Sequence, residues 1–513
     1  MERIPVLGGF SRRTFMQVAS AAALYPGLSM PAFAQAKFRR KNVEDPSAAN
    51  DLASYKLAVE AMLKLPPDDP RNWYRLAVTH LIDCPHGNWW FFPWHRAYLG
   101  WFERTCRELS GDANFALPYW DWTASPKIPA SFFGNVLDPT TDPFLPDAAA
   151  FEKAYKSEIE KLWLNATPAQ QTSLTQRGFT SFDVLWSTLM ANFAPRAKGR
   201  RLTASNPNLP TPDAVKLSVV EGGLKPKKYV FDADRGFSSA AAPNHSIGSA
   251  QAIIEGIPHN TVHNDIGGNM PTMLSPIDPI FYMHHSNIDR LWDVWDIVNN
   301  DAPNVDGFKN EEFLFFVDAK GKPVAEVKTS DYMKIGPFDY DYQPGSGTVP
   351  LLLAAGEEAL PGPLMAEGEA RFSMEETATL EVPLAAAGAQ LAATPLFDVM
   401  ELTFLPPAHG AASGVRFNVF LSAGEPPKDL SFQGEDYVNS ITLFGHGAGH
   451  EVAPMTFTVP VREALEKLAE RGTLTAGTTA LYVTLLADEI HPDTISNREA
   501  VNGQLLGVKL GNF

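Results

Sequence analysis

Histidine is the residue whose distribution in this chain points most directly to chemistry. Seven of the 12 histidines fall in two short stretches, which hold His80, His86 and His95 in the first and His259, His263, His284 and His285 in the second. His259 and His263 are four residues apart, so on a helix both imidazoles would project from one face and could share one metal ion. Such a pair also arises by chance on amphipathic helices, so the surrounding residues must indicate whether it binds a metal ion.

The side chains near these histidines are large and apolar. Trp94 and Tyr98 flank His95, and Phe281 lies four residues before His285. Burying an imidazole in such surroundings is costly without a partner, and a bound metal ion is an economical partner. A structural protein with buried histidines and no metal is the alternative.

The residue types favour copper over other metals. Helical zinc hydrolases need Glu directly after the first histidine of the pair, and Asn260 stands there instead. Only Cys84 and Cys106 carry thiols, so a thiolate cluster is excluded, and no CxxCH haem motif occurs. Two groups of three neutral imidazoles, with no carboxylate at ligand spacing, suit copper better than magnesium, calcium or manganese.

Length and charge set broad limits on the rest of the chain. With 513 residues, the chain is long enough for more than one domain at roughly 100 to 200 residues each. Lys and Arg number 42 against 59 for Asp and Glu, and the formal charge is −17. This balance argues against nucleic acid or an anionic membrane surface as the main partner.

Residues 1–34 have the composition of an export signal. Arg12 and Arg13 form a twin-arginine signature, and an apolar run over 15–28 leads to an A-x-A site that ends at Ala34. We expect cleavage after Ala34, export by the twin-arginine route and a periplasmic or secreted protein. A short membrane anchor is the alternative, but the run is shorter than the ~20 residues that a helical span needs. No later segment reads as a membrane span.

The periodicity of apolar residues divides the remaining chain into two kinds of structure. From about Val43 to Asp301 the spacing predicts helices, and between about 126 and 249 the pattern weakens, so we expect long loops with a few helices there. Beyond Tyr342, a linker rich in Gly, Ala and Pro precedes segments in which apolar and polar residues alternate, which is typical of strands. One helix is expected there, at about 461–471. The alternating segments are Thr379–Val382, Val399–Phe404, Arg416–Phe420 and Leu481–Leu485.

We therefore expect a mainly α domain over 35–345, a linker over 346–369 and a C-terminal β-sandwich over 370–513. The sequence shows no internal repeat.

Four motifs in the helical region carry a family resemblance. They are FFPWHR at 91–96, LPYWDW at 117–122, PHNTVH at 258–263 and DPIFYMHHSNIDRLW at 278–292. Together they resemble the coupled binuclear, or type 3, copper proteins: tyrosinases, catechol oxidases and hemocyanins. The resemblance covers about residues 70–345. It implies a central four-helix bundle that holds two copper ions, with O2 bound between them as the co-substrate that oxygenates a phenol or accepts electrons from a diphenol.

The resemblance also assigns the residues around the copper ions. The first ion would be bound by His80, His86 and His95, the second by His259, His263 and His285, and His284 would support the ligands without binding copper. Cys84, two residues before His86, is similar to the cysteine that forms a thioether to a copper-binding histidine in fungal tyrosinases and molluscan hemocyanins. A free thiol, or a disulfide to Cys106, is the alternative. Cys106 is otherwise expected to be a buried thiol.

Four further residues would influence the reaction and its substrates. Glu255 and Asn260 resemble the Glu and Asn that hold a water in tyrosinases able to deprotonate monophenols, with Glu255 on the loop that enters a helix opened by Pro258. An ordinary solvated Glu is the alternative. Phe281 resembles the ring that packs on bound substrate, and Met273 stands where a gate residue lies over the copper. Plain core filling is the alternative for Met273.

The C-terminal region resembles the corresponding domain of plant polyphenol oxidases. Phe338–Tyr342 contains a Tyr-x-Tyr motif like the one that closes their catalytic domain, and the matches beyond it are short. In that family this domain covers the copper site and keeps the enzyme latent, so this chain is expected to be a latent proenzyme whose linker suits an activating protease. Phe444, His446 and His450 are candidates for a plug over the site or for copper delivery, and a solvated turn is the alternative.

The resemblance implies a phenol oxidase that hydroxylates monophenols and oxidises o-diphenols to o-quinones. Small phenols are the expected substrates. A catechol oxidase or an o-aminophenol oxidase without hydroxylase activity is one alternative, and a hemocyanin-like O2-binding protein is another. The sequence carries no signal for an oligomeric state.

Overall fold

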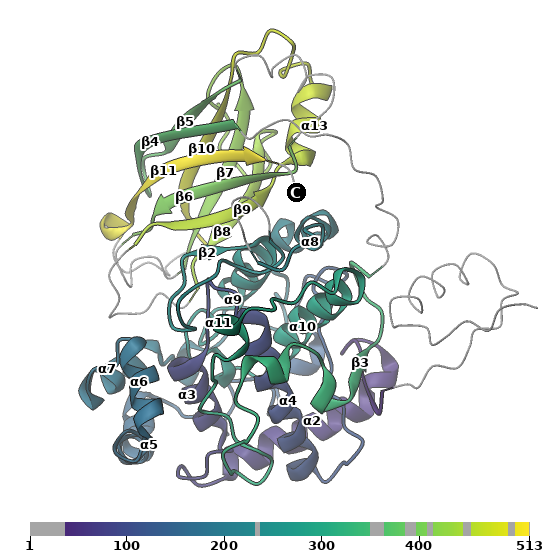
Figure 1. The fold of residues 1–513 in the computed structure, drawn as a ribbon, viewed down its shortest axis with the longest axis vertical. Coiled ribbons are helices and arrows are strands. Elements are labelled where there is room, and N and C mark those ends of the chain that lie inside the picture. The colour runs from purple at the N-terminus through teal and green to yellow at the C-terminus, as the bar shows by residue number, and fades with distance from the viewer. Residues whose placement is uncertain are drawn as a thin grey trace, which may run out of the picture.

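The structure is a computed structural model that describes residues 36–230, 236–348, 364–384, 397–407, 414–444, 453–490 and 498–511. The export signal expected at 1–34, most of the expected linker, and two plug candidates, His446 and His450, lie outside these ranges. Figure 1 shows two parts, a helical part and a β part stacked on it. None of the helices in the described ranges has the length and apolarity needed to cross a membrane.

Five helices form the centre of the helical part. They are α2 (Ala49–Lys64), α3 (Trp73–Asp83), α4 (Phe91–Ser110), α9 (Asn260–Ile266) and α10 (Ile280–Asn299). The Asn72 side chain caps the start of α3 by accepting the Tyr74 N–H. Gly111 ends α4 with a φ of +73°, which glycine adopts without strain. Helix α4 packs against both α2 and α10, and it is buried along most of its length.

Aromatic rings fill the space between these helices. The rings of Phe102 and Tyr282 stack at 3.6 Å between centroids, and Trp73 packs edge-on against Phe102 at 6.1 Å. All three side chains are buried. Because aromatic side chains bury large apolar areas, this core gives the four helices that carry the histidines a rigid frame.

The region between 126 and 249 holds a few helices separated by loops, as its sequence predicted. It contains α5 (Ala148–Leu164), α6 (Pro168–Gln176), α7 (Phe182–Asn192) and α8 (Leu217–Leu224), and a short α11 (Asp306–Lys309) follows later. The first three begin at side-chain caps, provided by Asp147, Thr167 and Ser181. The predicted combination of long loops and a few helices is confirmed, and these caps sit in the Pro-, Ser- and Asn-rich stretches that resemble loops.

The β part is a sandwich of two sheets. Its strands are β4 (Leu364–Ser373), β5 (Ala378–Pro383), β6 (Val399–Leu405), β7 (Val415–Ala423), β8 (Tyr437–Thr442), β9 (Met455–Pro460), β10 (Ala480–Glu489) and β11 (Asn502–Gly511). One sheet has the order β5-β10-β7-β8, and the other, which includes β2 (Ala250–Gln251), has the order β2-β9-β6-β11-β4. Phe404 of the second sheet meets Phe417 of the first at 5.3 Å between centroids. All four predicted strand segments are confirmed, and the predicted helix is α13 (Arg462–Glu470).

One strand of the second sheet comes from the helical part. This is β2 (Ala250–Gln251), which pairs in parallel with β9 and lies at the junction of the two parts in Figure 1. Two asparagines of α9 reinforce the junction, because Asn260 and Asn264 donate side-chain N–H groups to the carbonyls of Thr442 and Leu443, each at 3.0 Å. The β part is therefore hydrogen-bonded to the helix that carries His263 and directly follows His259.

The ends of the helical part are joined by a small two-stranded sheet. In it β1 (Phe38–Arg40) pairs in parallel with β3 (Tyr340–Tyr342). The Arg40 guanidinium is fully buried and donates to Glu103 and Asp289, while the hydroxyl of Tyr342 donates to Asp289. These bonds satisfy a buried charge that would otherwise be costly, and they tie both strands to α4 and α10.

Candidate metal centre

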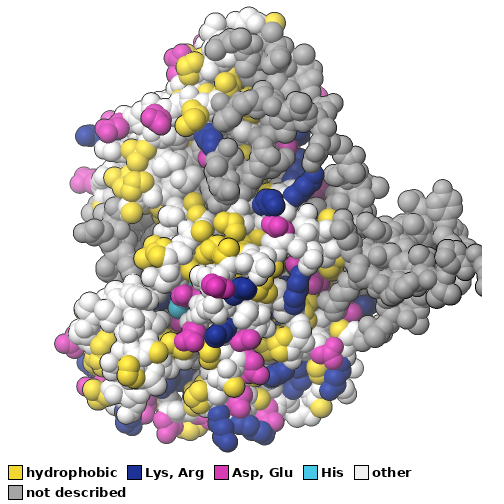
Figure 2. Space-filling view, viewed as in Figure 1, with side chains coloured by type: hydrophobic (Ala, Val, Ile, Leu, Met, Phe, Trp, Pro, Cys, Tyr) yellow, Lys and Arg dark blue, Asp and Glu magenta, His cyan; other side chains and the backbone are white. Residues whose placement is uncertain are grey.

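The structure brings together seven histidines that lie on four helices or directly beside them. His80 lies on α3, His95 on α4, and His86 on the loop between these helices, while His263 lies on α9 and His284 and His285 lie on α10. His259 lies just before α9. The first stretch, with Cys84, forms one group and the second stretch forms another, and within each group the possible ligand atoms lie within 4.8 Å of one another. Histidine is almost absent from the surface seen in Figure 2.

Backbone carbonyls fix the tautomer of three of these rings. A carbonyl only accepts hydrogen bonds, so a ring nitrogen beside it carries the proton and the other nitrogen keeps its lone pair. The pairs are His80 Nδ1 with Met273 O at 2.7 Å, His95 Nδ1 with Phe91 O at 2.8 Å, and His263 Nδ1 with Met270 O at 2.6 Å. All three rings thus present a bare Nε2, which is the usual arrangement of a metal-binding histidine.

His259 and His285 complete the second group. His259 Nδ1 lies 2.9 Å from Asn260 Oδ1, and its Nε2 is buried with no hydrogen-bond partner among the described residues. His285 Nε2 lies 3.0 Å from His263 Nε2. Buried polar atoms without partners are rare in folded proteins, and a cation among these nitrogens would satisfy them. The donor set therefore fits a metal ion.

Burial keeps these rings neutral. It lowers the pKa of His80 and His259 to about 3, in each case mainly because a charged ring would lose its hydration. Burial likewise lowers the pKa of four more of these histidine side chains, which are His86, His95, His263 and His285. Neutral imidazole is the form that binds a metal ion, so the site needs no further deprotonation to accept one.

His284 differs from its neighbour His285 in its hydrogen bonding. The indole Nε1 of Trp122 donates to His284 Nδ1 at 3.2 Å. Since an indole N–H only donates, Nδ1 is the acceptor and the neutral ring carries its proton on Nε2. His284 therefore has no bare Nε2 to offer, which favours His285 as the third ligand of its group.

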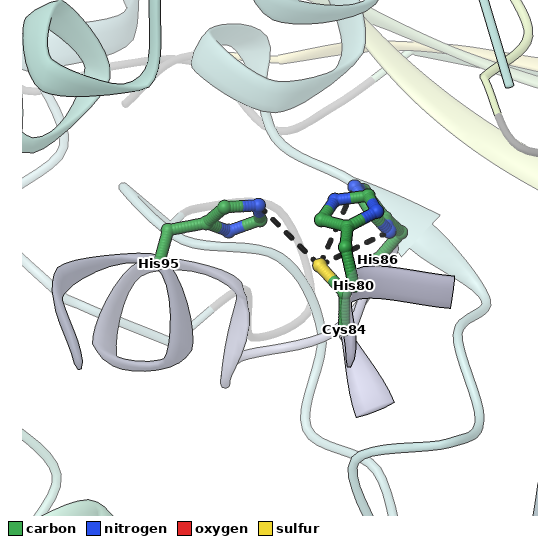
Figure 3. Close-up of side chains that lie close together, drawn as sticks. All are labelled: His80, Cys84, His86 and His95. Carbon is green, nitrogen blue, oxygen red and sulfur yellow. Dashed lines mark hydrogen bonds between the residues drawn. The ribbon is translucent and has the colours of Figure 1, made fainter. Parts of the chain in front are cut away.

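Cys84 lies beside His86, as Figure 3 shows. Its Sγ is 3.8 Å from Nδ1 and 4.0 Å from Nε2 of His86, and 3.3 Å from Nε2 of His95. Both Cys84 and Cys106 are buried and unpaired, so the alternative of a disulfide between them was wrong. Burial raises the pKa of both thiols, which keeps them protonated.

Glu255 is buried in the site, and the alternative of a solvated Glu was wrong. Its carboxylate accepts the Gly87 N–H at 2.6 Å and the hydroxyl of Ser239. Burial raises its pKa to about 8, and these two hydrogen bonds act in the opposite direction. The expected loop is absent as well, because Glu255 begins the π-turn η5 (Glu255–His259), which contains Pro258. Such turns recur at functional sites because they reorient one helical turn.

Phe281 and Met273 lie close to the histidines in different ways. The Phe281 ring is fully buried and packs against His285 at 4.2 Å and His80 at 5.2 Å between centroids. Met273 is partly buried against the core, and its carbonyl accepts from His80. Phe281 thus forms a wall of the site, and Met273 contributes its backbone to it.

Phe444 reaches this site from the β part. Its ring is 3% exposed, and its centroid lies 4.2 Å from that of His263, 4.7 Å from His86 and 5.4 Å from His259. The alternative of a solvated turn was wrong for Phe444. A benzene ring from the C-terminal region therefore lies against histidines of both groups.

Sequence patterns missed several residues that hold the site together. Met270 acts through its backbone carbonyl, which no side-chain pattern can indicate, whereas Trp122 lies in LPYWDW and could have been singled out. His245, just before the second stretch, contacts Asp83 at 3.1 Å and Glu311 at 2.6 Å and is bonded to carboxylates rather than grouped with the other histidines.

Comparisons with known proteins agree with this geometry. Residues 64–297 match the family model for the common central domain of tyrosinase. "Tyrosinase HcTyr1" of Hahella sp. (strain CCB-MM4) is 25% identical over 464 residues, covering 82% of this chain and 89% of the relative. The latent chloroplastic polyphenol oxidase of Prunus armeniaca is 27% identical over 321 residues, which is 58% of this chain and 47% of the relative. This match thus spans about half of the plant protein's length.

Solved structures show the same architecture. Latent apple tyrosinase superposes with a TM-score of 0.55 at 18% identity, covering 94% of this chain and 98% of that one. Recombinant latent aurone synthase, a polyphenol oxidase, superposes with a TM-score of 0.56 at 19% identity, covering 94% and 90%. The helical part with a C-terminal β part is therefore a shared fold.

Proposed function

The helical part of this chain belongs to the tyrosinase and polyphenol oxidase family, and we propose that the chain is a phenol oxidase that hydroxylates monophenols and oxidises o-diphenols to o-quinones. The family supports copper-dependent oxidation of phenols. The observation that carries the proposal is the convergence of two buried, neutral histidine groups on one site.

In this proposal six histidines hold two copper ions. His80, His86 and His95 would hold the first, and His259, His263 and His285 the second, while His284 supports the group through Trp122. The bound copper pair would supply the redox chemistry by which O2 is reduced at the expense of the phenol. The protein holds the ligand rings in one orientation, because four of them are fixed through Nδ1 by the carbonyls and the Asn260 side chain described above.

The hydroxylation of a monophenol requires that the phenolic proton be removed. We propose that Glu255 removes this proton, acting through a water molecule that it shares with Asn260. Both side chains are buried, and a carboxylate whose pKa lies near neutral pH is well matched to a general base. A diphenol loses its first proton more readily, so Glu255 matters less for its oxidation.

Phe281 and Met273 would shape the phenol pocket. Phe281 is already seated against His80 and His285, so it would position an aromatic substrate by ring contact. Met273 would line the entrance with a flexible side chain that accepts rings of different shape.

Cys84 would form a thioether with His86. The sulfur lies 3.8 Å and 4.0 Å from the two ring nitrogens of His86, and we assign the bond to Cε1, the carbon between them. Forming the C–S bond removes the thiol hydrogen and one ring hydrogen, and O2 accepts the two electrons and two protons. The bond would fix the one ligand of the first group that lies on a loop rather than a helix.

The β part would keep the enzyme latent, with Phe444 occupying the place of a phenol ring. The centroid of the Phe444 ring lies 4.2 Å from that of His263, which leaves no room for a substrate ring between them. In this proposal residues 35–345 are the catalytic domain, 346–369 the linker that an activating protease cuts, and 370–513 the lid. Residues 1–34 would direct export.

The experiment compares initial rates of O2 uptake with a monophenol and the matching o-diphenol before and after linker cleavage. The proposal requires both substrates to be oxidised after cleavage and much less before it. Oxidation of the diphenol alone would indicate a catechol or o-aminophenol oxidase, and an O2 adduct without turnover would indicate a hemocyanin-like protein.

A further inference from the structure

The side-chain amide of Asn260 is fully engaged in hydrogen bonds. Its Oδ1 lies 2.9 Å from His259 Nδ1, and its Nδ2 donates to Gln251 Oε1 at 2.7 Å and to Thr442 O at 3.0 Å. A primary amide has two N–H donors, so both are in use. The orientation of this amide decides whether His259 faces an oxygen or an N–H group.

That orientation matters for the metal site. With Oδ1 toward His259, the ring must donate from Nδ1 and keep its lone pair on Nε2, the atom that is buried without a partner. If the amide turned over, its N–H would face His259 Nδ1, and the ring would hold its proton on Nε2 instead. The two acceptors on Nδ2 therefore favour the tautomer that can bind metal, in the same direction as the backbone carbonyl of Glu255, which also accepts from this ring.

These two acceptors come from different parts of the protein. Thr442 belongs to the β part, whereas Gln251 belongs to the helical part, on strand β2, and is 2% exposed. The backbone of Gln251 pairs with Phe457 of β9, so this residue takes part in the junction and also contacts Asn260. If the β part is displaced, as the proposed function requires, the Thr442 carbonyl is lost and only Gln251 remains to orient the amide.

We propose that Gln251 is a positioning residue for the second copper site, because its carboxamide oxygen orients Asn260 and, through it, the tautomer of His259. This inference rests on the proposed function and adds a residue to it. The carboxamide oxygen of Gln251 accepts its hydrogen bond from Asn260, so Gln251 acts through Asn260. Gln251 occupies one N–H of Asn260 in either state, whereas the other N–H is bound to Thr442 while the lid is docked and becomes free for a water once the lid has moved.

The chain offers a matched control for the docking of the β part. Asn264 lies one turn after Asn260, is equally buried, and donates to Leu443 O at 3.0 Å and to the backbone carbonyl of Asn260 at 2.9 Å. Asn264→Ala therefore removes a bond to the β part and leaves the contacts of Gln251 and His259 in place.

The test measures how fast a chelator removes copper from the whole, copper-loaded chain. Substitutions of residues that orient metal-binding histidines commonly cost 10–100-fold in affinity, so Gln251→Leu should release one of two copper ions about 10-fold faster and the other at the wild-type rate. Gln251→Glu keeps an oxygen acceptor of the same reach and should restore slow release. Asn264→Ala should release both ions at the wild-type rate.

Three results would overturn the inference. They are unchanged release from Gln251→Leu, equal acceleration in Asn264→Ala, and failure of Gln251→Glu to restore retention, since each would show that the acceptor of Gln251 does not act on the site. If Gln251→Leu does not fold, the rate of copper release from Gln251→Glu is compared with that from Gln251→Met instead. A wild-type chain that holds no copper would refute the proposed function instead, so the two failures are distinguishable.

Discussion

Replacing Phe444 by alanine should open the site in the uncleaved chain. The ring is 3% exposed and lies 4.2 Å from His263 and 4.7 Å from His86 between centroids. Burying a phenylalanine side chain is worth about 1.5–3 kcal/mol, and each 1.4 kcal/mol changes an equilibrium tenfold. The closed state should therefore lose a factor of about 10–100, and the uncleaved variant should oxidise a diphenol about 10–100 times faster than the wild type.

The assay is the initial rate of O2 uptake with catechol by copper-loaded, uncleaved protein. Phe432→Ala is the matched control, because Phe432 lies in the same β part but is 37% exposed and packs on Tyr437 instead of the histidines. Linker cleavage should then accelerate the wild type and Phe432→Ala, and add little to Phe444→Ala.

Two results would refute this reasoning. An unchanged rate in Phe444→Ala would show that the ring does not block the site. An equal increase in Phe432→Ala would show that a looser β part, rather than removal of the plug, admits the substrate.

Three further predictions concern the buried groups of the site. Glu255→Gln should reduce the monophenol rate at least 10-fold more than the diphenol rate, and an equal loss of both rates would contradict the role of a base. In the copper-free chain, the raised pKa of Glu255 means that the unfolded state loses this proton near pH 4.5 and the folded state near pH 8. The contribution of Glu255 to the free energy of unfolding should therefore decrease across that window, and Glu255→Gln should flatten the dependence of Tm on pH; an unaltered slope would argue against a buried, protonated Glu255. Intact mass of the copper-loaded chain should be two hydrogens below the sequence value, unchanged by reductant, and Cys84→Ser should remove this deficit. A full mass in the wild type would exclude the thioether to His86.

The sequence predicted the parts of the site that depend on local patterns. The two histidine stretches, the helical spacing around them and the alternation in β6, β7 and β10 each follow from residues close in sequence, and the structure confirms the resulting elements. Cys84 could be placed next to His86 for the same reason, since only one residue separates them.

The parts that were missed depend on contacts between distant segments. Whether Glu255 is solvated depends on Ser239 and Gly87, and no periodicity connects these three residues. Phe444 meets His86 across more than 350 positions, so its burial follows from how the β part docks. The π-turn at Pro258 also escaped prediction, because a proline before a helical pattern usually marks the first turn of a helix.

Copper content together with phenol turnover in the wild type and His263→Ala tests the central claim most directly. His263 belongs to the second group, and its Nε2 lies 3.0 Å from that of His285. The account predicts two copper ions per wild-type chain and diphenol oxidation after linker cleavage, and at most one copper ion and no oxidation in His263→Ala. Phenol oxidation that persists in His263→Ala, or a wild-type chain that oxidises phenols without copper, would contradict it.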